Sequence, residues 1–193
     1  CYHGHVDYLL VSAGSGLLTG GISSSAGVSP AAAAEVLVPQ FNDIERVREV
    51  VIDQGDDIAA INVEPVAGNM GLVPPAQGFL EGLREVSDQA GVLLIFDEVQ
   101  CGMGRTGKLF AHEHEGVTPD LMTLAKALGN GIPIGALCAP YACAEILVPG
   151  SHASTFGGNP LATACGVAGG GSWAGGKTCE CTAFGNSEGG GGP

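Results

Sequence analysis

The chain contains GVLLIFDEVQ at residues 91–100, an unbroken apolar run that ends in two acids, Asp97 and Glu98. A short apolar run that follows a glycine is typical of a strand buried on both faces. A second such run, LMTLAKALGNG at residues 121–131, carries Lys126 where the apolar residues give way to a glycine-rich turn. We therefore expect two buried strands, one closed by an acid and the other by a lysine.

Helical patterns alternate with further strand-like runs along the middle of the chain. Asn42 and Asp43 form a helix-capping pair, and a second helix is expected to open at Pro74-Pro75. The apolar residues at helical spacing are Ile44, Val47, Val50 and Val51 in the first helix, and Phe79, Leu80, Leu83 and Val86 in the second. The strand-like runs are residues 58–63, 91–96, 121–125 and 134–139.

This alternation predicts an α/β fold with a parallel, doubly wound sheet flanked by helices. Ligands of such sheets bind beyond the carboxyl ends of the strands. Glu64, Asp97 and Lys126 all fall at such ends, so we expect the three side chains to share one site.

A lysine and an acid at neighbouring strand ends suit a pyridoxal phosphate site. A partly desolvated lysine is nucleophilic toward a carbonyl and can form a Schiff base, and the acid can hold the pyridine nitrogen protonated. Taken singly, an acid after a strand is more often a strand end or a helix cap, and a lysine there is more often a surface residue. The order of Asp97 and Lys126, with the sequence around them, favours the cofactor site.

The composition excludes several classes of partner. A net charge of −13 argues against a nucleic acid or an anionic membrane, and no apolar run is long enough to span a bilayer. The seven cysteines are irregularly spaced, which predicts reduced thiols in an intracellular compartment rather than a disulfide framework. His112-Glu113-His114-Glu115 could suggest a metal site, but no third ligand group accompanies it, so we predict a polar segment and no metal.

The two ends of the chain differ from its middle. Residues 166–193 include eleven glycines and little apolar periodicity, which predicts a disordered tail after a partial large domain at residues 1–165. The sequence begins at Cys1 without an initiator methionine, and we expect the chain to be a fragment.

Several motifs in this order identify the family that the chain resembles. Over about residues 1–165 it resembles the class III aminotransferases, which are pyridoxal-phosphate enzymes of fold type I. CYHGH at residues 1–5 and EPVAGNMGLVPP at residues 64–75 are similar to glutamate-1-semialdehyde 2,1-aminomutase. DEVQCGMGRTGK at residues 97–108, the Lys126 segment and STFGGNP at residues 154–160 are more similar to acetylornithine or ornithine aminotransferases. A composite sequence or a diverged relative would both give this pattern.

The resemblance implies a role for each matching residue. Lys126 would carry the cofactor as an internal aldimine and shuttle a proton, and Asp97 would pair with the pyridinium nitrogen. Glu64 would stand on the substrate side. The remaining cofactor-binding positions would be Tyr2 and Val99 on the two ring faces, His3 beside Tyr2, Gln100 near the phenolic oxygen, and Thr155 on the cofactor phosphate of a partner subunit. The site therefore implies a homodimer.

The resemblance leaves three alternatives for function. An aminomutase would convert glutamate-1-semialdehyde to 5-aminolevulinate, and His5, where ornithine-type members carry arginine, favours it. An aminotransferase would instead pass an amino group from acetylornithine or ornithine to 2-oxoglutarate. A truncated or composite product would have no activity, because the family's phosphate-binding loop and small C-terminal domain are not recognisable here. The expected compartment is the cytoplasm, or the plastid stroma in a photosynthetic eukaryote.

Overall fold

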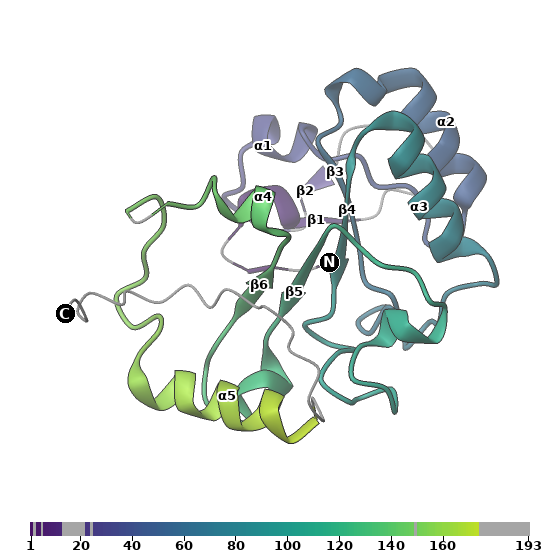
Figure 1. Cartoon of the computed structure of the whole chain (residues 1–193). Helices are drawn as coiled ribbons and strands as arrows, with labels where there is room; N and C mark the ends of the chain where they lie inside the picture. Colours follow the sequence, from purple (N-terminus) through teal and green to yellow (C-terminus); the bar gives the residue numbers. More distant parts are fainter. Residues whose placement is uncertain (2, 5, 13–21, 24, 149, 174–193) are drawn as a thin grey trace. The chain divides into compact units, whose positions relative to one another are not determined.

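The computed structural model describes the chain except for residues 2, 5, 13–21, 24, 149 and 174–193 (Figure 1). It divides into two compact units. Unit 1 comprises Cys1–Ile61 and Pro75–Val92, and unit 2 comprises Asn62–Pro74 and Leu93–Pro193. Within the described residues, no helix has the length and apolar character that crossing a membrane requires.

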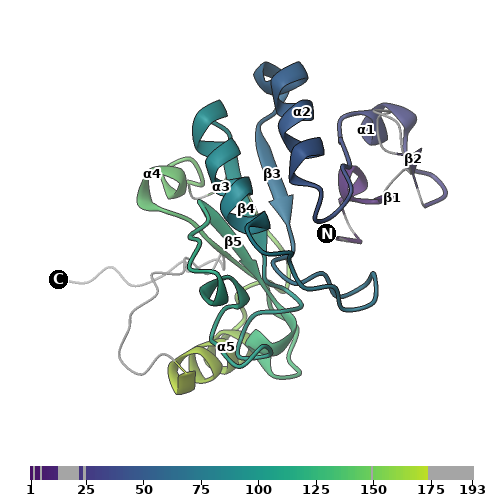
Figure 2. The ribbon, with the colours of Figure 1, turned by 90° about the vertical axis from the view of Figure 1, so that its right-hand side faces the viewer.

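Unit 1 is mainly helical. Its two long helices are α2 (Ile44–Gln54) and α3 (Phe79–Ala90), which lie side by side (Figures 1 and 2). A pair of two-residue antiparallel strands, β1 (Val11–Ser12) and β2 (Ile22–Ser23), lies near the short helix α1 (Pro30–Ala34). The single-turn helices are η1 (Asp7–Leu9) and η2 (Gly55–Asp57).

The two long helices follow the apolar pattern of the sequence. Asp43 caps α2, because its carboxylate accepts the backbone N–H of Arg46 at 3.0 Å. The predicted face of α3, from Phe79 to Val86, is buried. The predicted start of α3 at Pro74-Pro75 is wrong. A proline disfavours the helical conformation in the residue before it, and Gly78 has a left-handed backbone with φ of 80°. The helix therefore begins at Phe79.

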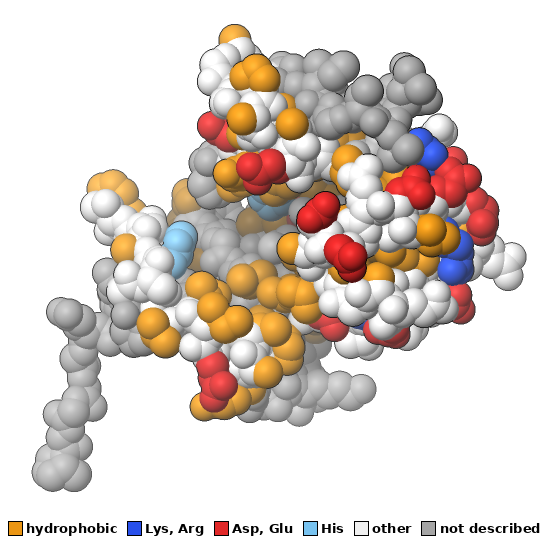
Figure 3. Space-filling model, turned by 90° about the horizontal axis from the view of Figure 1, so that it is seen from above, with side chains coloured by type: hydrophobic (Ala, Val, Ile, Leu, Met, Phe, Trp, Pro, Cys, Tyr) orange, Lys and Arg blue, Asp and Glu red, His pale blue; other side chains and the backbone are white. Residues whose placement is uncertain are grey.

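Ion pairs lie on the surface of the same helices. Arg46 pairs with Glu49 at 2.6 Å, Arg48 with Glu85 at 3.1 Å, and Arg84 with Asp88 at 2.7 Å. Figure 3 shows acidic and basic side chains gathered at the side of the molecule where these helices lie. The chain has 20 acidic and seven basic residues, which gives its net charge of −13.

The main sheet has the strand order β3-β4-β5-β6, and unit 2 contains β4, β5, β6 and the end of β3. The strands are β3 (Ala60–Val63), β4 (Leu93–Asp97), β5 (Leu121–Leu124) and β6 (Ala136–Cys138). β4 and β5 are parallel, with Asp97 opposite Thr123, whereas β6 is antiparallel to β5. The sheet is mixed because β6 runs antiparallel to β5, to which residues 125–135 alone connect it. A parallel crossover needs a longer connection.

Buried apolar side chains from this sheet form the core of unit 2. Leu94 and Phe96 of β4 are fully buried, and a cluster of Met122, Leu124, Leu128 and Cys138 lies on β5, β6 and the turn between them. The other helices of unit 2 are η3 (Ala111–His114), η4 (Lys126–Gly129), α4 (Tyr141–Ala144) and α5 (Pro160–Trp173).

Helix α5 packs against η4 through glycines (Figure 2). A Cβ at Gly169 would lie 2.9 Å from the backbone oxygen of Leu128, so the absence of a side chain permits this close approach. Residues 166–173, the first part of the predicted glycine-rich tail, are thus helical. Residues 174–193 lie outside the described part of the chain, and the boundary at residue 165 stays a prediction.

Candidate active site

The carboxyl ends of β4 and β5 bring two of the predicted residues to neighbouring positions. Asp97, the last residue of β4, is 4% exposed. Its Oδ1 accepts hydrogen bonds from the Val99 N–H at 3.1 Å and from the Thr123 hydroxyl at 3.2 Å. The adjoining strand reaches Lys126 two residues after it ends. The Asp97 carboxylate is therefore fixed beside the strand that leads into the lysine.

Lys126 opens the single-turn helix η4 with a left-handed backbone, φ of 45°. Its Nζ donates a hydrogen bond to Oε1 of Gln100, which lies three residues after Asp97. The lysine is exposed, so burial does not supply the desolvation that the sequence suggested. What restrains the amine instead is the amide of Gln100.

Glu64 and the segment after it belong to the same unit and adjoin Gln100. Oε2 of Glu64 accepts the backbone N–H of Gly68 at 3.0 Å. A Cβ built on Gly68 would lie 2.7 Å from Cγ of Gln100. Contacts therefore lead from Glu64 through Gly68 and Gln100 to Lys126, all within unit 2.

The structure describes three of the other predicted positions, Val99, Thr155 and His3. Val99 is half-buried and meets Asp97 through its backbone N–H. Thr155 is exposed in the loop before α5, where the Gly157 N–H donates to the Ser154 C=O. His3 belongs to unit 1, and its C=O accepts the Val6 N–H at 3.1 Å. Tyr2 and His5 lie outside the described residues.

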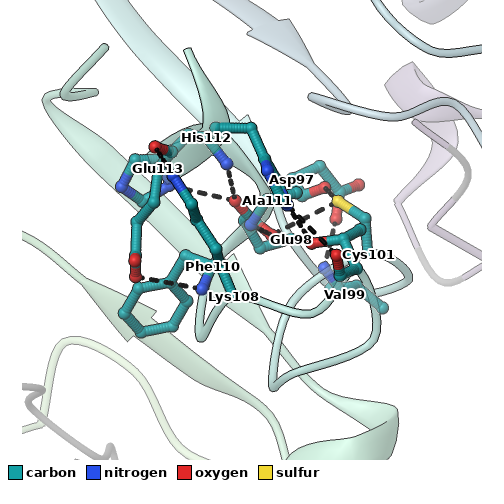
Figure 4. Close-up of polar contacts among 11 residues, drawn as sticks. Asp97, Glu98, Val99, Cys101, Lys108, Phe110, Ala111, His112 and Glu113 are labelled. Atoms are coloured by element: carbon teal, nitrogen blue, oxygen red, sulfur yellow. Dashed lines mark hydrogen bonds and ion pairs between the residues drawn. The ribbon is translucent and has the colours of Figure 1, made fainter. Parts of the chain in front are cut away.

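Glu98 is the residue that sequence reasoning missed. Its side chain is 1% exposed and accepts hydrogen bonds on both oxygens (Figure 4). Oε1 accepts the backbone N–H of His112 at 2.9 Å and lies 3.0 Å from its Nδ1. Oε2 accepts the Ala111 N–H at 2.9 Å and faces Sγ of Cys101 at 3.3 Å. Glu98 thus ties the turn after β4 to the helix η3.

The electrostatics of this cluster keep one group ionised and the other protonated. Burial raises the pKa of Glu98, but the hydrogen bonds from the His112 side chain, the two backbone N–H groups and Cys101 outweigh it and hold the pKa below its ordinary value. Burial, followed by the charge of Glu98, raises the pKa of the Cys101 thiol to about 12. Cys101 is therefore a buried thiol that donates to a carboxylate.

The two histidines of the segment from His112 to Glu115 contact groups of the protein itself. His112 pairs with Glu98, and Nε2 of His114 lies 3.1 Å from the backbone oxygen of Thr106. No group of three potential ligands occurs in the part of the chain that the structure describes. Among the cysteines described there, Cys101, Cys138, Cys143 and Cys165 are free thiols. The spacing of His112 from Glu98 gave no sequence signal, since fourteen positions separate them.

Known proteins are similar to this chain in sequence and in architecture. The aminotransferase class-III family model matches residues 1–169. The chain is 50% identical over 171 residues to a glutamate-1-semialdehyde 2,1-aminomutase from Pelotomaculum thermopropionicum, covering 87% of this chain and 39% of that protein. It is similar to a solved transaminase with PLP bound, at a TM-score of 0.76 and 31% identity over 88% of this chain and 41% of that one. An acetylornithine aminotransferase from Elizabethkingia anophelis gives a TM-score of 0.66 and 44% identity, over 68% of this chain and 33% of that one.

The chain thus spans well under half the length of the proteins it matches, 39% for the aminomutase. The similarity covers both the strand ends and the segment of Glu64. The mixed sheet with flanking helices is the fold type I architecture that the sequence predicted, in incomplete form.

Proposed function

Because this chain belongs to the class III aminotransferases, we propose that it forms part of an enzyme that transfers an amino group with pyridoxal 5′-phosphate as cofactor. The observation that carries the proposal is the hydrogen bond from the Lys126 amine to the amide of Gln100. Gln100 lies three residues after Asp97, whose buried carboxylate ends β4.

The residues present fit this cofactor. Lys126 offers an exposed amine to an aldehyde, and Asp97 offers a carboxylate whose orientation is set by Val99 and Thr123. When bound, pyridoxal phosphate supplies an electron sink for negative charge at the substrate α-carbon. We assign Asp97 to pair with the ring nitrogen of the cofactor, and Gln100 to lie near its phenolic oxygen. Lys126 holds the cofactor and then moves a proton at the substrate α-carbon.

The remaining residues are assigned by their family motifs. Val99 and Tyr2 pack on the faces of the ring, with His3 beside them, and Glu64 faces the substrate. Thr155 is assigned to the phosphate of a cofactor bound by a second copy of the chain, which makes the enzyme a homodimer. We assign it to the cytoplasm, or to the plastid stroma in a photosynthetic eukaryote.

The proposed reaction is that of glutamate-1-semialdehyde 2,1-aminomutase. Its support is the 50% identity to two such proteins over most of this chain. An acetylornithine or ornithine aminotransferase is the second candidate, and the 44% identity to a solved acetylornithine aminotransferase favours it. The two differ in their need for an acceptor: an aminomutase forms 5-aminolevulinate without 2-oxoglutarate, whereas the aminotransferase forms glutamate only in its presence. A product that retains these motifs without activity is the third candidate, since the chain spans a minor part of its relatives.

A borohydride trap tests the assignment of the lysine. The chain is mixed with pyridoxal phosphate, reduced and digested, and the pyridoxyl group is located by mass spectrometry. We expect it on Lys126, and we expect Lys126→Arg to lose the label at that position. A label spread over Lys108 and Lys177 in the unaltered chain would contradict the proposal, and no label at all would favour the inactive product.

A further inference from the structure

We propose that Gly68 is a positioning residue of this site, an inference that rests on the proposed function. The side chain of Gln100 occupies the space that a side chain at position 68 would fill. A Cβ on Gly68 would lie 2.7 Å from Cγ of Gln100, 3.3 Å from its Cδ and 3.4 Å from its Nε2. The same Gln100 carries the Oε1 that accepts from Lys126. Gly68 therefore leaves the room in which Gln100 reaches the lysine.

Hydrogen bonds fix both the N–H and the C=O of Gly68. Its N–H donates to Glu64 at 3.0 Å, and its C=O accepts from the N–H groups of Gly71 at 3.2 Å and Leu72 at 3.1 Å. Two further hydrogen bonds, of 3.0 and 2.8 Å, pair Ala67 with Val73 across the same loop. The loop therefore cannot retreat from Gln100 without breaking several hydrogen bonds.

The backbone of Gln100 is equally restrained. The turn around it closes with a hydrogen bond of 2.8 Å from the Gly102 N–H to the Glu98 C=O. The buried Glu98 and Cys101 lie on either side of it in the turn, and the backbone of Val66 contacts the Cys101 sulfur. Since both backbones are fixed, a side chain at position 68 can be accommodated only if the Gln100 side chain turns away.

Gly68→Ala is thus a test of the side-chain contact alone. Gly68 has no left-handed φ, so alanine meets no backbone strain there. The new methyl displaces Gln100 from Cγ outward, and the hydrogen bond to Lys126 is lost. Gly68→Ala should therefore behave like Gln100→Ala at the lysine.

The measurement is reductive methylation of Lys126 by formaldehyde and cyanoborohydride, scored by peptide mass against Lys108 of the same chain. A lysine that donates to Gln100 gives up this bond when it attacks an aldehyde. We expect both Gly68→Ala and Gln100→Ala to raise the ratio of Lys126 to Lys108 methylation by about two- to fivefold. In Gln100→Ala, which has no Cγ, adding Gly68→Ala should cause no further change.

Matched controls separate the contact from general damage. Gly55→Ala should leave the ratio unchanged, because its Cβ would meet only Cγ1 of Val51 at an ordinary 3.7 Å. Protection of the buried Cys101 from alkylation reports that each variant is folded. An unchanged ratio in folded Gly68→Ala, with a raised ratio in Gln100→Ala, would overturn the inference. Formaldehyde needs no cofactor site, so if pyridoxal phosphate fails to label Lys126 while the ratios change as expected, the proposed function fails and the Gly68–Gln100 contact stands.

Discussion

Lys126 adopts a backbone conformation that residues with a side chain seldom adopt, with φ of 45°. The turn that contains it is closed by a hydrogen bond of 2.9 Å from the Leu128 N–H to the Ala125 C=O. Such strain persists only where the surrounding structure imposes it, and it concentrates at functional sites. Here it falls on the residue to which the sequence assigned the chemistry.

Asp97→Asn separates the charge of this carboxylate from its hydrogen bonds. The asparagine keeps an oxygen that can accept from Val99 and Thr123 but brings no negative charge to the ring nitrogen. We expect turnover of the cofactor-loaded protein to fall by roughly 100-fold or more, while pyridoxyl trapping on Lys126 persists. Asp120→Asn is the control, because Asp120 accepts the Leu94 N–H at 2.7 Å near the start of β4, away from the carboxyl end that carries Asp97. Equal losses in both variants would point to the sheet rather than to the charge.

Glu98→Gln tests the buried cluster. Both oxygens of Glu98 accept hydrogen bonds, so an amide would turn its NH₂ group toward an N–H donor of Ala111 or His112. We expect the free energy of unfolding, measured by urea denaturation and circular dichroism, to fall by about 2–4 kcal/mol.

Glu113→Gln is the matched control, because Glu113 lies on η3, the helix that carries the hydrogen-bond partners of Glu98. Glu113 is exposed and accepts the Phe110 N–H at 3.1 Å. Its replacement should cost less than about 1 kcal/mol, because water can satisfy the groups that are released. Losses of the same size in the two variants would contradict the importance of burial at Glu98.

At the scale of the elements, replacing a glycine of α5 by alanine should change the stability of its packing on η4 by an amount that depends on which glycine is replaced. Gly169→Ala would place its Cβ 2.9 Å from a backbone oxygen of Leu128, which cannot rotate away, and we expect a loss of about 1–3 kcal/mol in unfolding free energy. Gly166→Ala would meet the end of the Ile134 side chain at 3.2 Å and Cγ of Leu128 at an ordinary 4.0 Å, and alanine gains up to about 1 kcal/mol of helix propensity. Its stability should equal or exceed that of the unaltered chain. If urea denaturation showed Gly166→Ala to be less stable than Gly169→Ala, this packing would be disproved.

Local signals predict some of these elements and not others. The cap at Asp43 and the helical spacing after it suffice for α2, and unbroken apolar runs suffice for β4 and β5. The direction of β6 could not be predicted from its own residues, because an apolar run does not encode the direction of its partner. Helix α5 was missed since glycines disfavour helix, and its formation depends on contacts with η4 that are distant in sequence.

At the scale of the whole molecule, the candidate site could be predicted because parallel strands present their carboxyl ends at one edge of the sheet. The positions of Glu64, Asp97 and Lys126 follow from that rule. The role of Glu98 does not, because Glu98 lies in the turn after β4, where no periodicity of the sequence tells which way its side chain points. Its partners on η3 become its neighbours only when the chain folds.

The same carboxylate links the stability of the molecule to pH. Burial raises the pKa of Glu98, yet its hydrogen bonds hold the folded pKa below the ordinary value of 4.5. A carboxyl group whose pKa is lower in the folded state stabilises the fold above its unfolded pKa, and this contribution is lost as the pH falls through the folded pKa. We therefore expect the difference in unfolding free energy between the unaltered chain and Glu98→Gln to be largest above the ordinary pKa of 4.5 and to shrink as the pH falls through the lowered folded pKa. Urea denaturation at a series of pH values measures it. A constant difference across the pH series would mean that folding does not change the pKa of Glu98, and a difference that shrinks as the pH rises would mean that burial raises it.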